Sequence, residues 1–178
     1  VVMWGWGVMN STAIKEAAAV GYPMDRFIGN HWAGAEVDVR PAGDSAEGYL
    51  AANFHAPGAQ FDVHQDIITH VYDAGNGTGD RERVGEVLYN RGVVNAAITA
   101  EAIRVAQEMH GQRPLTGAEV RDGFENLELT TERLTELGLD GFMNPVEVSC
   151  ADHEGGGAIF IQQWDGQDWQ RVSEWIPP

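Results

Sequence analysis

The sequence predicts an α/β fold built on parallel strands, and three observations lead to this prediction. The first thirty residues alternate strand, turn, helix and strand, which is the order of a βαβ unit. A third strand, Tyr49 to His55, follows a loop rich in glycine. Beyond Gly141 the hydrophobic period changes from helical to alternating, which predicts short strands at the end of the chain. A chain of 178 residues is long enough for one compact domain or two small lobes.

The chain opens on VVMWGWG, Val1 to Gly7, which carries no charge and includes two tryptophans. Apolar runs bounded by glycine are typical of strands that bury both faces inside a parallel sheet. We therefore expect a core strand here, with at least one of Trp4 and Trp6 in the core. A first residue inside a core strand indicates that sequence upstream of Val1 is missing.

A helix and a second strand are expected next. Asn10-Ser11-Thr12 offers capping side chains to a helix over TAIKEAAAVG, which ends at Gly21. MDRFIGN, Met24 to Asn30, reads as the second strand. A loop from Asn30 to Gly48 leads to the third strand.

The middle of the chain is predicted to be helical. Phe61, Ile67, Ile68 and Val71 have the spacing of one helical face. The longest helical pattern runs from Val84 to His110, and its small residues allow close approach to a sheet. Two shorter helices are expected after it, one started by a capping box of Thr116 and Glu119 and one capped at Thr130-Thr131.

Three short strands, VEVS, AIFIQQW and WQRVSEWI, are expected at the end of the chain. The last two are joined through Asp165 to Asp168, a sequence typical of a hairpin turn. The fold should therefore end in a β-hairpin.

Charge argues against nucleic acid as a partner. There are 27 acidic and 11 basic residues, for a net charge of -16, which repels phosphate backbones and anionic lipid surfaces. The single cysteine, Cys150, allows no internal disulfide. No apolar run approaches the roughly 18 residues of a membrane span, and Val1 to Gly7 does not have the form of a secretory signal.

No enzyme signature is found, so we expect no catalytic residue and no cofactor. The patterns GxSxG, GxxxxGK and GxGxxG are missing, since GWG at Gly5 to Gly7 lacks the third glycine. Cys150 to Glu154 contains residue types that bind zinc, but it lacks a second ligand pair, and the following glycines indicate a turn. His64 and His70 are six residues apart, which is a poor spacing for a shared helical face. No metal site is predicted.

Several motifs follow one another in a familiar order: AGDSAEGY, YNRGVVNA, EAIRVAQ, LTGAEVRDGFENL and ADHEGGGAIFIQQWDGQDW. Together they resemble the last half of the type I periplasmic binding proteins, nearest to the branched-chain amino acid, amide and urea receptors of ABC importers. The resemblance implies an incomplete chain from a protein of two Rossmann-like lobes that close on a ligand.

The resemblance also implies a division of the chain. Residues 1–55 would belong to the second lobe, residues 56–145 would be helices of the first lobe, whose sheet is absent, and residues 146–178 would form crossing strands and the terminal hairpin. The helices would then expose a large apolar face unless the missing N-terminal lobe or a second chain covers it. A membrane permease is the other implied partner, and a periplasmic location is expected, with the secretion signal upstream of Val1.

The ligand site implied by the resemblance lies at the carboxyl ends of the strands. Asp44, in AGDSAEG, matches an acid that holds the ligand's ammonium, and as an alternative it caps a helix. Trp6 and Gly7 match the mouth of the cleft, with Trp6 as an apolar wall and N–H donor or, alternatively, a core residue. His31 and Trp32 follow the second strand and either line the cleft or simply connect elements.

These expectations describe a solute-binding protein for an amino acid or a related amide or aromatic acid. Replacing Asp44 by alanine should then weaken the binding of an ammonium-bearing ligand by about tenfold or more. The alternatives are a cytoplasmic amide or amino-acid sensor of the same fold and, more distantly, an α/β hydrolase. A secretion signal in the complete gene would separate the first two, and turnover of ester or amide substrates would reveal the third.

Overall fold

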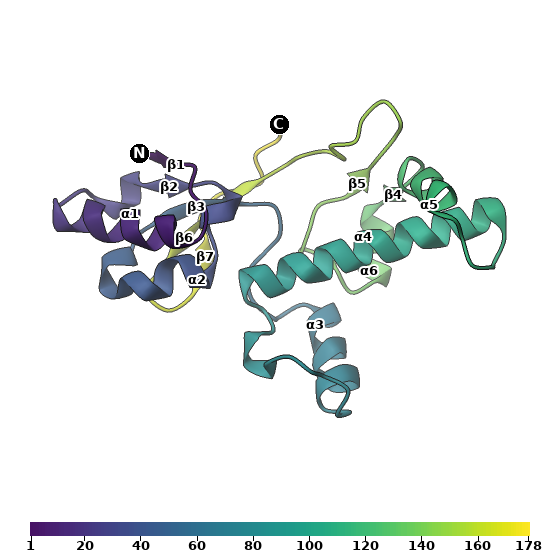
Figure 1. Cartoon of the computed structure of the whole chain (residues 1–178), viewed down its shortest axis with the longest axis horizontal. Helices are drawn as coiled ribbons and strands as arrows, with labels where there is room; N and C mark the ends of the chain where they lie inside the picture. Colours follow the sequence, from purple (N-terminus) through teal and green to yellow (C-terminus); the bar gives the residue numbers. More distant parts are fainter.

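A computed structural model describes residues 1–178 as two units joined side by side (Figure 1). One is an α/β unit formed by both ends of the chain, and the other is a helical unit formed by its middle. The α/β unit carries helices α1 (Val8–Ala19) and α2 (Glu36–Val39). The helical unit carries α3 (Asp62–Ile67), α4 (Val87–His110), α5 (Gly117–Phe124) and α6 (Thr131–Glu136). None of these helices is both long and apolar enough to cross a membrane.

A five-stranded sheet forms the centre of the α/β unit. Its strands are β1 (Val2–Met3), β2 (Ile28–Gly29), β3 (Leu50–Asn53), β6 (Phe160–Trp164) and β7 (Trp169–Arg171), in the order β1-β2-β3-β6-β7. The first three strands are parallel, and β6 and β7 are antiparallel additions beside β3. The predicted α/β class and the C-terminal hairpin are therefore confirmed. At the hairpin turn the Asp165 carboxylate accepts the backbone N–H groups of Gln167 and Asp168.

The opening segment differs from its prediction. β1 lies at the edge of the sheet, and Val2 is 74% exposed, so within this chain it is not a core strand. Trp4 and Trp6 are 80% and 62% exposed, and the expectation that one of them is core was wrong. The physical reason is that β1 ends at Met3, so both tryptophans lie beyond the sheet. Gly5 packs so closely that a Cβ there would lie 2.1 Å from Asn10 Oδ1.

Helix α1 begins at Val8, four residues before the predicted TAIKEAAAVG segment. Asn10 is not its cap, because it is fully buried and points into the unit. Its Nδ2 donates to Asp38 Oδ1 at 2.8 Å and to the Trp32 carbonyl at 3.1 Å. The predicted capping residue therefore holds the neighbouring loop in place.

The core of the α/β unit is a mixed aliphatic and aromatic cluster. Ile14 of α1, Phe27, Tyr49 and the hairpin tryptophans Trp164 and Trp169 are all nearly inaccessible. The Tyr49 hydroxyl donates to the Ala33 carbonyl at 3.1 Å, so its polar end is satisfied. The second predicted strand is shorter than expected, because Met24–Arg26 forms a 3-10 turn.

The helical unit has a separate leucine-rich core. Buried Leu127, Leu129, Leu134, Leu139 and Phe142 cluster with Val94 of α4. The predicted capping box of α5 is confirmed, with reciprocal bonds between Thr116 and Glu119. A π-helical turn, Ile68–Tyr72, continues α3. Strands β4 (Glu128–Leu129) and β5 (Val146–Glu147) form a small second sheet, and β4 was not predicted because two residues show no period.

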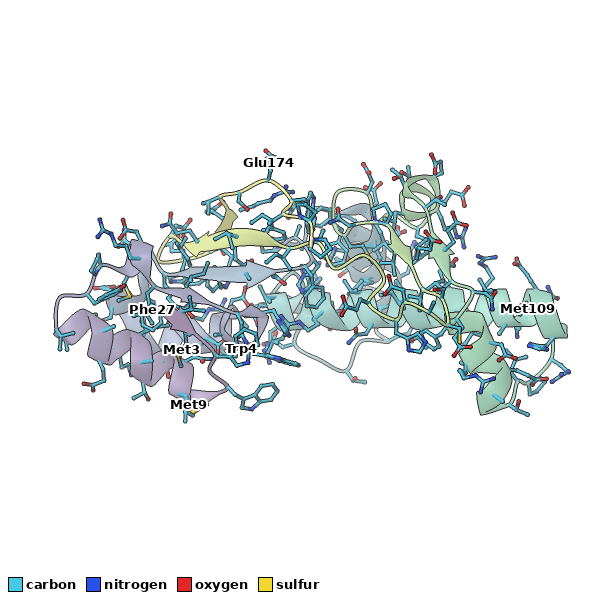
Figure 2. All side chains as sticks on the ribbon, turned by 90° about the horizontal axis from the view of Figure 1, so that it is seen from above. Met3, Trp4, Met9, Phe27, Met109 and Glu174 are labelled. Atoms are coloured by element: carbon cyan, nitrogen blue, oxygen red, sulfur yellow. The ribbon has the colours of Figure 1, made fainter.

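The two units are joined by chain crossings and by polar contacts at the start of α4. The chain passes into the helical unit after β3 and returns before β6 (Figures 1 and 2). Glu36 accepts the N–H of Val87 at 2.9 Å, and Arg40 forms an ion pair with Glu86. One turn further along, Asn90 Nδ2 donates to the backbone carbonyls of Ala56 and Gly58. The first turns of α4 are therefore fixed against the α/β unit, and its far end, marked by Met109 in Figure 2, extends away from it.

Candidate functional site

Three of the predicted site residues meet at the carboxyl edge of the parallel strands. Trp6 follows β1, and His31 and Trp32 follow β2. The ring centroids of Trp6 and Trp32 are 4.7 Å apart, and those of His31 and Trp32 are also 4.7 Å apart. Phe54, which follows β3, lies 5.9 Å from His31. We call these four residues the aromatic cluster.

Arg91 brings a positive charge to the aromatic cluster from the helical unit. Its guanidinium carbon lies 5.5 Å from the Trp32 ring centroid and 5.2 Å from that of Phe54. Its Nη2 donates to the His31 carbonyl at 2.8 Å. The second turn of α4 thus reaches across to the carboxyl edge, because its first turn is fixed there by Glu36.

The aromatic cluster is open to solvent on one side. Trp6 is 62% exposed and Trp32 is 44% exposed, which is unusual for large apolar side chains that already pack on each other. Burial, with a smaller effect from Arg91, lowers the pKa of His31. The lowered pKa favours the neutral imidazole, in which one ring nitrogen can accept a hydrogen bond.

Buried and partly buried hydrogen bonds fix the His31–Trp32 loop to the rest of the α/β unit. The Asn30 side chain accepts the N–H of Trp32 at 3.0 Å, and Asn10 donates to the Trp32 carbonyl. Asp38 accepts from Asn10 with one oxygen and from the Ala35 N–H with the other. Burial raises the pKa of Asp38, and these hydrogen bonds oppose the effect. The loop is thus positioned by polar contacts to two other segments.

Gly7 lies at the start of α1, next to Trp6. Its φ of 58° is in the left-handed region, which favours glycine. No side chain caps α1, so the first N–H groups of the helix face the same edge as the aromatic cluster without a side-chain acceptor.

The structure does not bring Asp44 to the aromatic cluster. Asp44 lies in the 3-10 segment Arg40–Ala46 before β3. Four residues later, Gly48 packs against Met24 and Asp25, which precede β2, so this stretch lies at the amino ends of the strands. The Asp44 side chain is exposed and forms no hydrogen bond, which also excludes the alternative role of a capping side chain.

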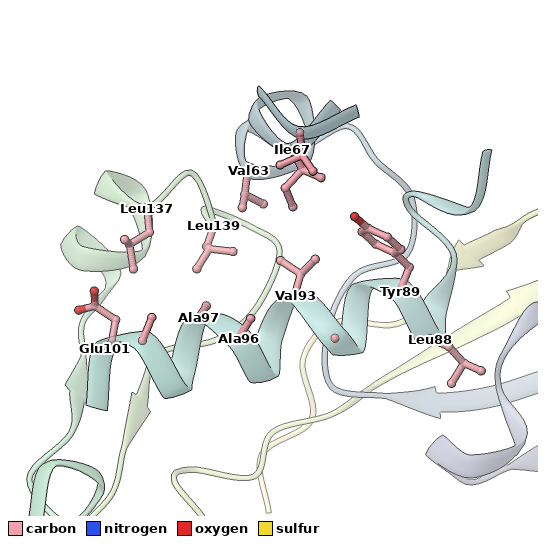
Figure 3. Close-up of a pocket in the computed structure, with 13 residues that line it drawn as sticks. Val63, Ile67, Leu88, Tyr89, Val93, Ala96, Ala97, Glu101, Leu137 and Leu139 are labelled. Atoms are coloured by element: carbon pink, nitrogen blue, oxygen red, sulfur yellow. The ribbon is translucent and has the colours of Figure 1, made fainter. Parts of the chain in front are cut away.

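A mostly apolar hollow lies elsewhere, on the helical unit. A groove of about 680 Å³ runs between α3, α4 and the end of α6, and eleven of its thirteen lining residues are hydrophobic (Figure 3). Val63 and Ile67 of α3 face Val93 and Ala96 of α4 across it, with Leu139 at its side. A second cavity, of about 610 Å³, is lined by Phe54 on the α/β side and by α4 on the other. Among the aromatic cluster, Phe54 alone lines either hollow.

No three His, Cys, Asp or Glu side chains lie close enough together to hold a metal ion. Cys150 is exposed and forms no disulfide. His64, one of the histidines considered from the sequence, is buried, and its Nε2 lies 2.7 Å from Asn90 Oδ1.

An open sheet with exposed aromatic side chains at the carboxyl ends of parallel strands is the arrangement of a small-molecule-binding α/β protein. The sequence profile of a family described as "Periplasmic binding protein" matches residues 1–168, and the chain belongs to this family. The predicted resemblance is confirmed.

Solved structures share the fold of this chain. A protein from the Pseudomonas fluorescens group, described as an ABC transporter permease, is 45% identical and has a TM-score of 0.93 over 99% of this chain and 43% of its own. A branched-chain amino acid ABC transporter protein from Thermus thermophilus with bound valine is 23% identical, with a TM-score of 0.72 over 99% of this chain and 45% of its own.

A solute-binding protein from R. palustris in complex with benzoate is 15% identical, with a TM-score of 0.61 over 97% of this chain and 42% of its own. The chain therefore spans less than half the length of these relatives. A search of curated proteins found no match.

Sequence reasoning missed two members of this site. Phe54 could have been found, because it follows β3 as Trp32 follows β2. Arg91 could not, because it lies 60 residues from His31 in the sequence, on a helix assigned to the other lobe.

Proposed function

We propose that the chain is the C-terminal half of the solute-binding component of an ABC importer, which binds an amino acid or a related amide or aromatic acid between two lobes. The aromatic cluster is one wall of the site. The observation that carries the proposal is the meeting of Trp6, His31 and Trp32 at the carboxyl edge, with both tryptophans exposed. An exposed apolar wall of this kind has a physical use if a ligand and a second wall cover it.

The second wall would be the N-terminal lobe. Relatives are more than twice as long as this chain, and the groove on α3, α4 and α6 is an apolar surface without a sheet against it. We propose that the sheet of the missing lobe packs on this groove, and that residues 1–55 and the terminal hairpin belong to the other lobe. Ligand binding would stabilise the closed form in the periplasm, where an ABC permease in the membrane recognises it.

Ligand titration of the full-length protein tests this function. Suitable probes are L-valine, L-leucine, L-phenylalanine, benzoate, acetamide and urea, measured by thermal shift and calorimetry. For a probe that binds, Trp6→Ala should weaken binding at least tenfold, about 1.4 kcal/mol. Trp4→Ala is the matched control, since Trp4 also follows β1 and is exposed but packs on no aromatic ring.

Equal effects of the Trp4 and Trp6 substitutions would place the ligand elsewhere, and failure of all six probes to bind would count against solute binding of this class.

Asp44→Ala tests whether the ligand lies at the site expected from the sequence or at the aromatic cluster. Because Asp44 lies away from the aromatic cluster, we expect its replacement to change affinity less than twofold, and a tenfold loss would restore it to the site.

A further inference from the structure

We propose that Arg91 is the specificity-determining residue of the ligand site and selects a ligand with a carboxylate group over its neutral amide. This inference rests on the proposed function, which leaves open whether the ligand is an acid or an amide. The residues that carry it are Arg91 on α4 and the rings of Trp32 and Phe54, whose centroids lie 5.5 and 5.2 Å from the guanidinium carbon.

The first argument is the missing partner of Arg91. Eight of the ten arginines form an ion pair with Asp or Glu, as expected in a chain of net charge -16. Arg26 is exposed to water and needs no partner. Arg91 is half-buried and forms no ion pair, so no carboxylate of this chain is in direct contact with its partly desolvated charge.

The nearest acid does not fill this role. Asp38 is close enough to act on the pKa of Arg91, but both of its oxygens are used by Asn10 and by the Ala35 N–H. Arg91 Nη2 donates to the His31 carbonyl, and its Nε–H is buried without any acceptor. The guanidinium therefore keeps hydrogen-bond donors that no acceptor of this chain uses.

The second argument is geometric. Two aromatic rings and one carbonyl hold the guanidinium in a fixed orientation, so little rotamer freedom is lost when it binds an anion. A guanidinium in such a position forms paired hydrogen bonds with a carboxylate, and it does so poorly with a neutral amide. The uncapped N-terminus of α1, beside Gly7, adds a positive partial charge at the same edge. The exposed tryptophans would then cover the apolar or aromatic body of the acid.

A purely structural role for Arg91 is the competing explanation, because the residue also links the helical unit to the α/β unit. The two explanations differ in what the substitution does to ligand choice. If Arg91 only links the two units, its substitution should weaken the binding of all ligands alike. If it binds a carboxylate, its substitution should weaken the binding of acids alone.

The test compares matched acid and amide probes in the full-length protein: benzoate with benzamide, and L-leucine with L-leucinamide. We expect the wild type to bind an acid at least tenfold more tightly than its amide, and Arg91→Met to weaken the acid at least tenfold while changing the amide less than twofold. Arg91→Lys keeps the charge but loses the planar pair of donors, and it should fall between the two. Arg171→Met is the control, because Arg171 also lies over two rings, Phe160 and Trp175, but already has Glu174 as an ion-pair partner.

Three outcomes would overturn the inference. If the wild type binds amides as tightly as acids, the inference is wrong although the protein still binds solutes. Equal loss of acid and amide binding in Arg91→Met would reduce Arg91 to a structural residue. If neither acids nor amides bind the wild type, the inference fails together with the proposed function. Should Arg91→Met not fold, the wild-type acid-to-amide ratio and Arg91→Lys still decide the matter.

Discussion

The segment that links β3 to the helical unit should make the fold sensitive to acid, through His55. This residue is fully buried between Phe54 and Phe142, its Nδ1 lies 3.3 Å from the Ala56 carbonyl, and its Nε2 has no partner. Burial is the main cause that lowers its pKa from 6.5 to about 4. The folded state therefore holds the neutral imidazole, while the unfolded chain takes up a proton near pH 6.5.

The sign and size of the effect follow from linkage. Because the folded pKa lies below the unfolded one, stability is unaffected above pH 6.5 and falls as the pH drops toward 4. At pH 5 the pKa difference corresponds to a loss of about 2 kcal/mol relative to pH 7, and at most about 3 kcal/mol at lower pH. Burial also lowers the pKa of His64, which adds a loss in the same direction.

Urea unfolding of the full-length protein at pH 7 and pH 5 measures this loss. His55→Phe removes the titrating group but keeps a ring between Phe54 and Phe142, so its stability should fall less between the two pH values than that of the wild type, by about 2 kcal/mol. His70→Gln is the control, since the His70 side chain is exposed, and it should behave as the wild type does. A variant His55→Phe with an unchanged pH dependence would refute the reasoning.

Two further predictions concern the helical unit, both measured as unfolding free energies of the full-length protein. Gly123→Ala should lower the unfolding free energy by about 1 to 3 kcal/mol, because a Cβ there would lie 2.1 Å from the Ala102 carbonyl of α4. The control is Gly117→Ala in the same helix, which meets nothing within 4 Å and should be nearly neutral. Equal effects of the two substitutions would show that α5 does not pack this closely on α4. Ala96→Glu, in the apolar groove, should lower the unfolding free energy by about 2 kcal/mol or more if the missing lobe covers the groove. The control is Ala19→Glu at an exposed position of α1, which should change it by no more than about 0.5 kcal/mol. A neutral Ala96→Glu would contradict the proposed packing of the lobes.

Much of the local structure could be predicted because its causes lie in neighbouring residues. Thr116 and Glu119 cap α5 within one turn. At the hairpin, the Asp165 carboxylate accepts the N–H groups of residues two and three positions later. The long helical pattern became α4, within three residues of its predicted start. The family could be recognised for the same reason, since its motifs are short segments in a fixed order.

The sequence by itself determined the α/β class, the long helix, the hairpin and the family, because hydrophobic period, caps and turn residues act over a few positions. The tertiary structure alone decided which side chains meet. It placed the opening strand at an edge with both tryptophans exposed, separated Asp44 from the carboxyl edge, and brought Arg91 to Trp32 and Phe54. These outcomes depend on how segments far apart in the sequence pack once the sheet has formed. A pattern of neighbouring residues carries no information about such long-range packing.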